Sequence, residues 1–264
     1  MIREVLVGVA WRVAPQRSSG IAAGSVPVSP FASIWRLDMI KRFLARFPNV
    51  RFSQAYGLTE STGGVFRAFG PEESQRLGST GRLMAGCEAK IVDPSTGIAL
   101  HPCEQGELWV RGPTIMKGYI GDEEATSAIL NSEGWLKTGD LCYIDNNGFL
   151  FVVDRLKELI KYKGYQVPPA ELEHLLQMHN DIIEAAVIPY PDDEAGEVPM
   201  AFIVRKPNST LQEAEIMELV AKQVASYRRI RRVSFVDSIP KNSTGKIMRK
   251  DLMKLAMIKT NSKL

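Results

Sequence analysis

Cationic side chains concentrate in residues 154–166, where they alternate with apolar residues. Three lysines and one arginine fall within nine residues, just before a glycine: Arg155, Lys157, Lys161 and Lys163. Cations on an extended segment beside a flexible glycine suit the binding of phosphate groups. A basic edge strand is the commoner explanation of such a pattern. The segment therefore indicates phosphate chemistry only together with other motifs.

Three further motifs stand in order around this segment. They are QAYGLTE at residues 54–60, TGD at 138–140 and PKNSTGK at 240–246. Each has a plain structural explanation when taken alone. Tyr56 and Gly57 suit a strand-to-loop turn, Asp140 suits a turn after Gly139, and Arg155 and the lysines suit a solvated surface. Their order along one chain makes the combination specific.

Composition narrows the class of protein. The chain has 264 residues, enough for one large or two ordinary domains, with 45% hydrophobic and 24% charged residues. A net charge of +3 is too small to indicate nucleic-acid binding. No apolar run approaches membrane-spanning length. Cys87, Cys103 and Cys142 are scattered, which fits a reducing compartment.

Periodicity predicts a β-rich first part. Apolar residues at Ile40, Phe43, Leu44 and Phe47 follow a helical spacing, and Pro48 ends the helix. A short helix is expected over residues 122–130. Strands are expected over residues 51–56, 88–93, 106–111, 141–144 and 149–153, the last two around a hairpin turn.

After residue 155 helices and strands alternate. Pro168 and Pro169 open a helix, and a capping box of Thr210 and Glu213 is expected to begin another. A basic helix begins near Met248. Strands are expected over residues 182–190, 200–205 and 233–236. This is a compact α/β unit of about a hundred residues, an ordinary domain size.

The four motifs, with GELWVRG at residues 106–112 between them, resemble the acyl-adenylate-forming superfamily. The chain looks most like plant 4-coumarate–CoA ligases and their peroxisomal relatives, from residue 37 to the end. The resemblance implies a truncated ligase of mixed α/β (α+β) class. In this interpretation, residues 1–36 are an unmatched, flexible leader, and residues 37–154 are the β-rich remainder of a large domain. Residues 155–258 are then a complete small lid domain, and residues 259–264 are a tail.

The resemblance implies roles for residues of the first part. Members of this family join a carboxylate to ATP and then transfer the acyl group to coenzyme A. The residue matching Glu60 holds Mg²⁺, and the one matching Thr59 hydrogen-bonds the α-phosphate, which suits hard oxygen donors. Tyr56 and Gly57 belong to the nucleotide and acyl site. Asp140 matches the aspartate that holds both ribose hydroxyls.

The second part receives its roles in the same way. Arg155 matches an arginine that contacts ribose and phosphate, and Lys246 matches the lysine that bridges the substrate carboxylate and the α-phosphate. The family's lid rotates between the two steps about the position of Lys157. Lys161 and Gln166 match residues that face the site in the thioester step, and the approach of coenzyme A would be lined by Lys163, Gly164 and Tyr165.

One family feature has no match here: the Ser/Thr/Gly-rich loop ending Pro-Lys-Gly that cradles the β- and γ-phosphates. Two hypotheses follow. The chain acts as an acyl–CoA ligase on a small carboxylic acid, or it is a catalytically incompetent fragment that binds nucleotide, coenzyme A or another protein. We expect exposed apolar surface on such a fragment.

The last three residues, Ser262, Lys263 and Leu264, form a peroxisomal address that an import receptor reads. They predict a peroxisomal protein, for which a fatty acid or jasmonate precursor is a better substrate than a cytosolic hydroxycinnamate. Residues 1–36 contain one acidic residue, Glu4, and this composition equally fits a transit peptide or a flexible leader.

Overall fold

The computed structural model describes residues 3–9, 37–243 and 245–261. The chain divides into two compact units, Met1–Val152 and Val153–Leu264. The predicted boundary after Asp154 lies two residues from this division. Within the described residues, no helix has the length and apolar character needed to cross a membrane.

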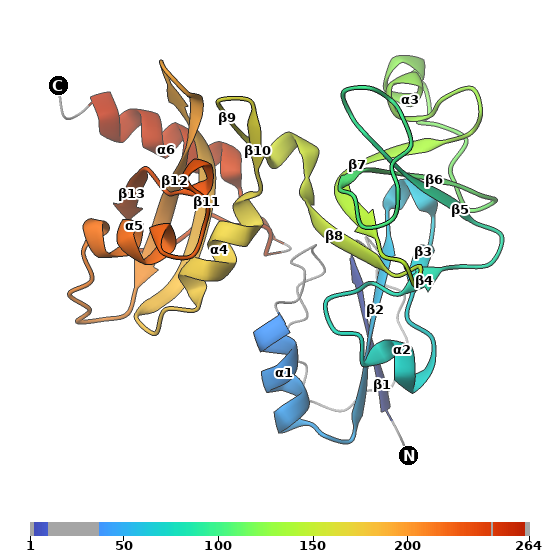
Figure 1. Cartoon of the computed structure of the whole chain (residues 1–264), viewed down its shortest axis with the longest axis horizontal. Coiled ribbons are helices and arrows are strands. Elements are labelled where there is room, and N and C mark those ends of the chain that lie inside the picture. The colour runs from blue at the N-terminus through green and yellow to red at the C-terminus, as the bar shows by residue number, and fades with distance from the viewer. Residues whose placement is uncertain (1–2, 10–36, 244, 262–264) are drawn as a thin grey trace. The chain divides into compact units, whose positions relative to one another are not determined.

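A four-stranded sheet opens the first unit (Figure 1), with the order β1-β2-β3-β4. Strand β1 runs parallel to β2, whereas the other neighbours are antiparallel. The strands are β1 (Arg3–Val9), β2 (Val50–Gly57), β3 (Gly64–Arg67) and β4 (Arg82–Leu83). Strand β1 lies within residues 1–36, the segment for which we expected an unmatched, flexible leader. Residues 10–36 lie outside the described part of the chain.

Helix α1 (Leu37–Arg46) confirms the predicted amphipathic helix, and the short helix α2 (Gly70–Ser74) was not predicted. Three of the four periodic apolar residues make its buried face: Ile40 is fully buried against Phe52 of β2, and Phe43 and Leu44 pack beside them. The fourth, Phe47, follows the last residue of the helix and is exposed. The contact of α1 with β2 fixes the strand that leads to the first motif.

A second four-stranded sheet completes this unit, with the order β5-β6-β7-β8. Its strands are β5 (Glu88–Val92), β6 (Gly106–Arg111), β7 (Leu136–Ile144) and β8 (Leu150–Arg155). The last three residues of β8 already belong to the second unit. Helix α3 (Glu123–Ile129) begins at Asp122, whose Oδ1 accepts a hydrogen bond from the Ala125 amide at 2.8 Å. The predicted strands and the short helix are present, and β7 begins five residues earlier than expected. One core joins both sheets, because Tyr56 and Phe66 pack in the same buried cluster as Leu108 and Leu136.

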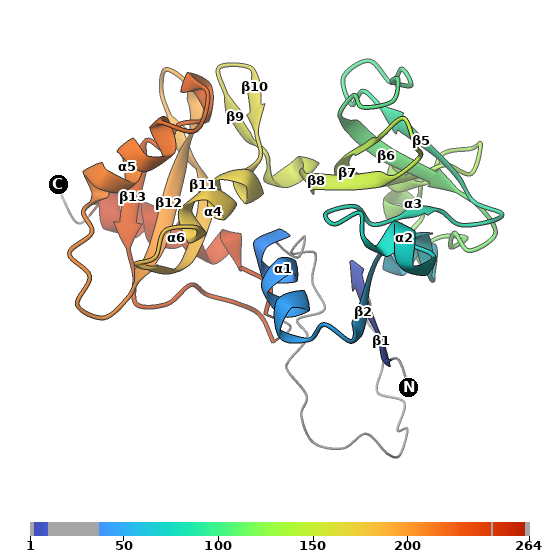
Figure 2. The ribbon, with the colours of Figure 1, turned by 60° about the horizontal axis from the view of Figure 1, so that its bottom comes forward.

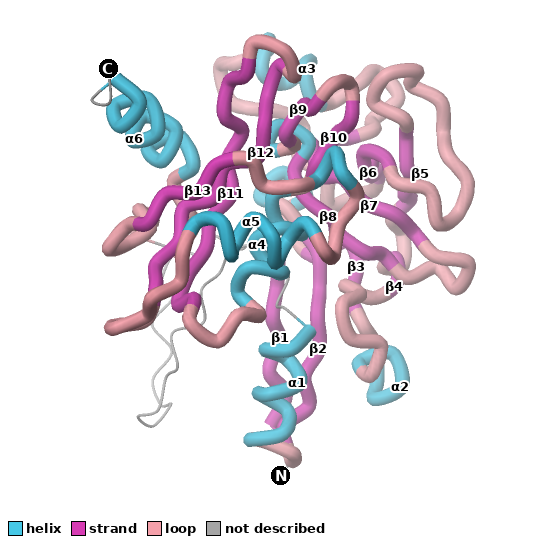
Figure 3. Tube along the Cα trace, turned by 60° about the vertical axis from the view of Figure 1, so that its left-hand side comes forward, coloured by secondary structure: helices cyan, strands magenta, loops and turns pink. Residues whose placement is uncertain are grey.

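The second unit is a five-stranded sheet between helices (Figure 2). The strands run in the order β10-β9-β12-β11, and β13 pairs with β12 in parallel. They are β9 (Ile160–Tyr162), β10 (Tyr165–Val167), β11 (Ile182–Asp192), β12 (Gly196–Arg205) and β13 (Arg232–Phe235). Figure 3 shows β11, β12 and β13 lying side by side. The helices are α4 (Pro169–Gln177), α5 (Glu213–Ala221) and α6 (Arg249–Asn261).

Both faces of this sheet are covered, which explains why β11 reads as a nearly continuous apolar run. Val187 faces the cluster that holds Leu172 of α4 and Ile216 of α5. Its neighbour Ile188 faces the other cluster, which holds Leu252 of α6. The sheet and its helices therefore make two cores, one on each face.

The predicted capping box of α5 is wrong by two residues. The helix begins after Gln212, whose amide donates to Glu215 Oε2 at 2.7 Å. Thr210 and Glu213 have the same spacing as this pair, so the motif alone could not select the register. The predicted helices at Pro169 and near Met248 are confirmed as α4 and α6.

Candidate functional site

A buried hydrogen bond joins two residues that the sequence assigned to the nucleotide site. Tyr56, near the end of β2, donates its hydroxyl to Asp140 Oδ2 at 2.7 Å, and both side chains are buried. Burial raises the pKa of Tyr56 well above its usual value, and the Asp140 charge adds to this. Tyr56 therefore stays a hydrogen-bond donor, which holds the aspartate in one orientation.

The backbone before Asp140 is fixed by Glu107 of β6. The Gly139 amide donates to Glu107 Oε1 at 3.0 Å, and Trp109 Nε1 donates to the other carboxylate oxygen at 2.8 Å. Gly139 has a φ of +69°, a conformation that glycine adopts without strain. The TGD motif is thus a bulge in the pairing of β7 with β6, and Asp140 within it bonds Tyr56.

Thr59 and Glu60 lie on a single 3-10 turn, η1 (Thr59–Ser61), directly after β2. The Tyr119 hydroxyl donates to Glu60 Oε1 at 2.8 Å, and this bond to a carboxylate raises the pKa of Tyr119 to about 12. Gly57 allows the turn to close: a Cβ there would lie 2.4 Å from the Gly63 carbonyl oxygen. Thr59 is the first residue of this turn and is exposed.

The oxygen donors at Glu60 fit a Mg²⁺ ion that takes its other ligands from water and substrate. Among the described residues, no group of three or more His, Cys, Asp or Glu side chains could hold a metal ion. Glu60 is half-buried and offers one carboxylate. Mg²⁺ commonly takes one or two protein carboxylates and completes its shell with water and substrate phosphates. Glu60 therefore fits an ion that arrives with a nucleotide.

Lys246 of the second unit lies among other cations. Burial lowers its pKa, and the charges of Arg155 and Lys157 lower it further, whereas Glu158 opposes them. The Lys246 amide donates to Asn242 Oδ1 at 2.8 Å, and the Gly245 amide donates to the Asn242 carbonyl at 2.9 Å. The loop is therefore folded on itself, and it brings three predicted residues, Arg155, Lys157 and Lys246, into one electrostatic neighbourhood.

The remaining predicted residues form the β9–β10 hairpin. Lys161 lies opposite Gln166 in the antiparallel register, so both side chains are on one face. Lys163 and Gly164 make the two-residue turn with φ of +45° and +84°, as a type I′ hairpin requires. Tyr165 is exposed and stacks on Tyr227 with ring centroids 4.4 Å apart. The alternative of a basic edge strand is wrong for Lys161, because β9 lies between β10 and β12 and the edge of the sheet is β10.

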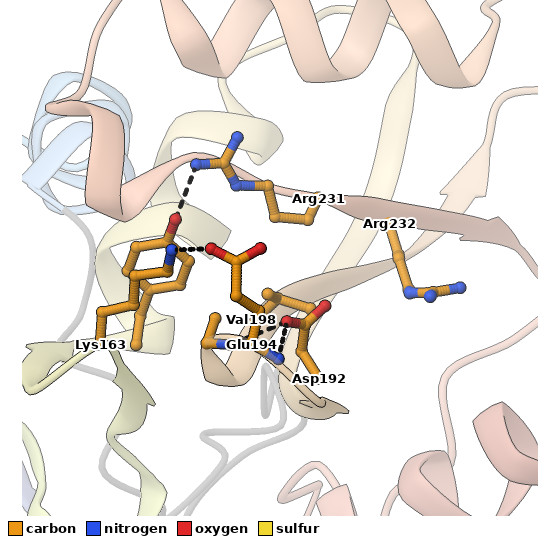
Figure 4. Close-up of a pocket in the computed structure, with 8 residues that line it drawn as sticks. Lys163, Asp192, Glu194, Val198, Arg231 and Arg232 are labelled. Carbon is orange, nitrogen blue, oxygen red and sulfur yellow. Dashed lines mark hydrogen bonds and ion pairs between the residues drawn. The ribbon is translucent and has the colours of Figure 1, made fainter.

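Lys163 also borders a pocket of about 330 Å³ in the second unit. Figure 4 shows Lys163 paired with Glu194 and Arg231 directed at the Tyr162 hydroxyl. Lys163 thus has a carboxylate partner within its own unit. The cationic lining suits an anionic group, although two carboxylates also border the pocket.

Among the contacts that the sequence did not predict, three join a predicted site residue to a residue outside the predicted set. Tyr119 bonds Glu60, Glu194 pairs with Lys163, and Glu158 lies 3.9 Å from Lys246. Glu158 lies within the basic segment, directly after Lys157, so the sequence alone could have indicated it as a partner for a cation. The others lie 59 and 31 residues from their partners and have no local signal.

Comparison with known proteins gives a consistent result. The model of the AMP-binding enzyme family matches residues 31–120, and that of the AMP-binding enzyme C-terminal domain matches residues 171–246. The 4-coumarate–CoA ligase-like 9 of Arabidopsis thaliana is 59% identical over 86% of this chain and 40% of its own length. Peroxisomal OPC-8:0-CoA ligase 1 of the same plant is 58% identical over 92% of this chain and 43% of its own.

Solved structures agree. ATP-bound MatB from Rhodopseudomonas palustris has a TM-score of 0.75 and 29% identity over 83% of this chain and 43% of its own. The o-succinylbenzoate CoA synthetase MenE from Bacillus subtilis, in complex with ATP and magnesium, has a TM-score of 0.72 and 32% identity. The match covers 96% of this chain and 46% of the MenE chain.

The structural matches show that the chain has the fold of adenylate-forming enzymes. The chain belongs to the AMP-binding, acyl-adenylate-forming family, and is similar to 4-coumarate–CoA ligase-like proteins. It spans about 40% of the length of the curated relatives it matches.

Proposed function

We propose that the protein is an ATP-dependent carboxylate–CoA ligase. A carboxylate oxygen of the acid attacks the α-phosphorus of ATP, and the bond to pyrophosphate breaks. The thiol sulfur of coenzyme A then attacks the acyl carbon, AMP leaves, and the thiol proton is released. The observation that carries the proposal is the half-buried Lys246, whose ammonium lies 3.9 Å from Glu158 on the segment that carries Arg155 and Lys157, because cations gathered in one place suit an anionic ligand.

The first unit holds the nucleotide. Asp140 accepts hydrogen bonds from the ribose hydroxyls, and the Tyr56 hydroxyl keeps its carboxylate oriented. Thr59 donates to the α-phosphate from the turn η1, and Gly57 lets that turn approach closely. Mg²⁺, when bound to Glu60 and the phosphates, neutralises phosphate charge.

The second unit supplies the cations. Lys246 bridges the acid and the α-phosphate, and Arg155 contacts ribose and phosphate with its fork of donors. Lys157 is the hinge about which this unit turns for the thioester step. The β9–β10 hairpin serves that second step: Lys161 and Gln166 face the reacting groups, and coenzyme A passes Lys163, Gly164 and Tyr165.

Binding of a non-hydrolysable acyl-adenylate analogue, an acyl sulfamoyl adenosine, tests the nucleotide site. Asp140→Asn is expected to weaken binding about 10- to 100-fold, because it removes a charged acceptor. Asp93→Asn is the control, since Asp93 caps an exposed turn of the same unit. Titration calorimetry measures both. Equal affinity for the Asp140 variant and the unchanged protein would remove Asp140 from the site.

The substrate class is a hydroxycinnamate, a fatty acid or a jasmonate precursor, and we place the protein in peroxisomes. The relative named peroxisomal OPC-8:0-CoA ligase supports this location. Ser262, Lys263 and Leu264 lie outside the described residues. A fluorescent protein fused to the N-terminus is expected to enter peroxisomes, whereas the same fusion with Leu264→Glu stays cytosolic. Cytosolic fluorescence from both fusions would refute the location.

A second candidate is a protein that binds nucleotide or coenzyme A, or another protein, without catalysing ligation. The cationic lining of the pocket beside Lys163 favours it, because such a lining suits an anionic group whether or not ligation follows. The two candidates differ in turnover and not in binding. An adenylate analogue that binds to a protein unable to exchange pyrophosphate would support the second.

A further inference from the structure

Arg249 connects two carboxylates from different elements of the second unit. Its Nε donates to Glu158 Oε2 at 3.0 Å, and its Nη1 lies 2.9 Å from Glu173 Oε1. The contact of Nη1 is an ion pair without a hydrogen bond, and Nη2 donates to Glu173 Oε2 at 3.4 Å. All three side chains are less than a fifth exposed.

The far end of this network is fixed to the sheet. Glu173, on α4, accepts the Val187 amide of β11 at 2.9 Å through the oxygen that faces Arg249. Arg249 is the first residue of α6, which packs on the opposite face through Leu252. The guanidinium is therefore held by elements that lie on both faces of one sheet.

The near end of the network reaches Lys246. Glu158 closes the 3-10 turn η2 (Leu156–Glu158), directly after Lys157, and its Oε1 lies 3.9 Å from Lys246 Nζ. Arg155, Lys157 and Arg249 repel the ammonium, and Glu158 attracts it. The same carboxylate thus binds a fixed cation through one oxygen and faces Lys246 with the other.

We propose that Glu158 is a positioning residue that holds the Lys246 ammonium in place, with Arg249 and Glu173 fixing the carboxylate. The inference deepens the proposed function, on which it rests for the role of Lys246. Without Glu158, the three surrounding cations would push the lysine side chain away. The same carboxylate follows Lys157 directly, so the position of Lys246 is tied to the hinge segment.

Amine reactivity of Lys246 tests this without requiring turnover. The neutral amine reacts with an acylating reagent such as acetic anhydride, and mass spectrometry resolves the peptide that carries Lys246. Glu158→Gln keeps the shape of the side chain but removes its charge. The pKa of Lys246 falls further in this variant, and acylation at fixed pH is expected to be about two- to fivefold faster. The pH profile of the rate should shift to lower pH.

Glu184→Gln is the matched control. Glu184 pairs at 2.6 Å with Lys241, which lies on the same loop as Lys246. The variant therefore makes the same charge change next to a neighbouring lysine. Its Lys246 reactivity is expected to match that of the unchanged protein. An unaltered pH profile in a folded Glu158→Gln protein would overturn the proposal. Should that variant not fold, Glu158→Asp retracts the carboxylate by one methylene, and unaltered reactivity there has the same meaning.

Pyrophosphate exchange separates this inference from the proposed function. In an active protein, Glu158→Gln is expected to lower kcat about tenfold with little change in the KM for ATP, and Glu158→Asp to recover part of the loss. Loss of ATP binding instead would point to a purely structural role. If the unchanged protein shows no exchange, the proposed function fails, and the acylation profile still decides whether Glu158 positions Lys246.

Discussion

Replacing Lys246 by alanine is expected to lower the rate of acyl-adenylate formation by about 100- to 1,000-fold, the usual effect of removing one preorganised charge donor. The ammonium is partly withdrawn from water, and the charges of Arg155 and Lys157 act on it, so its charge is more effective than one in water. Thioester formation from a supplied acyl-adenylate is expected to change little, because we assign that step to the β9–β10 hairpin.

The exchange of labelled pyrophosphate into ATP measures the first step, and formation of CoA thioester from synthetic adenylate measures the second. Lys241→Ala is the control for the loop: it removes a lysine five residues away that pairs with Glu184. Equal losses in the two lysine variants would mean that the loop matters only for folding. Equal losses in the two steps would place Lys246 in both.

Gly57→Ala is expected to destabilise the first unit by about 1–3 kcal/mol and to reduce binding of the adenylate analogue at least about tenfold. A methyl group at this position would lie 2.4 Å from the Gly63 carbonyl oxygen, which is backbone and cannot rotate away. The turn that carries Thr59 and Glu60 must then move. Chemical denaturation measures the free energy of unfolding, and calorimetry measures the binding.

Gly63→Ala is the matched control for Gly57→Ala, because nothing lies within 4 Å of a Cβ built there. It should leave both stability and binding close to those of the unchanged protein. Comparable effects of the two alanines would contradict the assigned cause, since only one of them creates a backbone collision.

Much of the fold could be predicted from the sequence, because a buried face of a helix or strand leaves a regular spacing of apolar residues. The helical spacing of Ile40 and Phe43 gave α1, and the apolar run around Val187 gave β11. Strand β1 was not predicted, because it becomes evident only through its pairing with β2. The N-terminus of α5 was misplaced because two capping boxes of equal spacing overlap in the sequence.

In the candidate site, too, some residues could be predicted from the sequence and others could not. Motifs identified Asp140, Glu60 and Lys246 as a set, but not the partners that hold them. The bond from Arg249 to Glu158 spans 91 residues, and the bond between Tyr56 and Asp140 spans 84. Such pairings depend on how strands and helices pack, which a single sequence does not encode as spacing.

The measurement that tests the central proposal most directly is carboxylate-dependent exchange of pyrophosphate into ATP by the purified protein. Hydroxycinnamates and medium- and long-chain fatty acids are the substrates to supply, with Mg²⁺ present. The proposal predicts exchange that requires one of these acids and that Lys246→Ala lowers about 100- to 1,000-fold. A folded protein that binds the adenylate analogue but exchanges no pyrophosphate with any of them would contradict it.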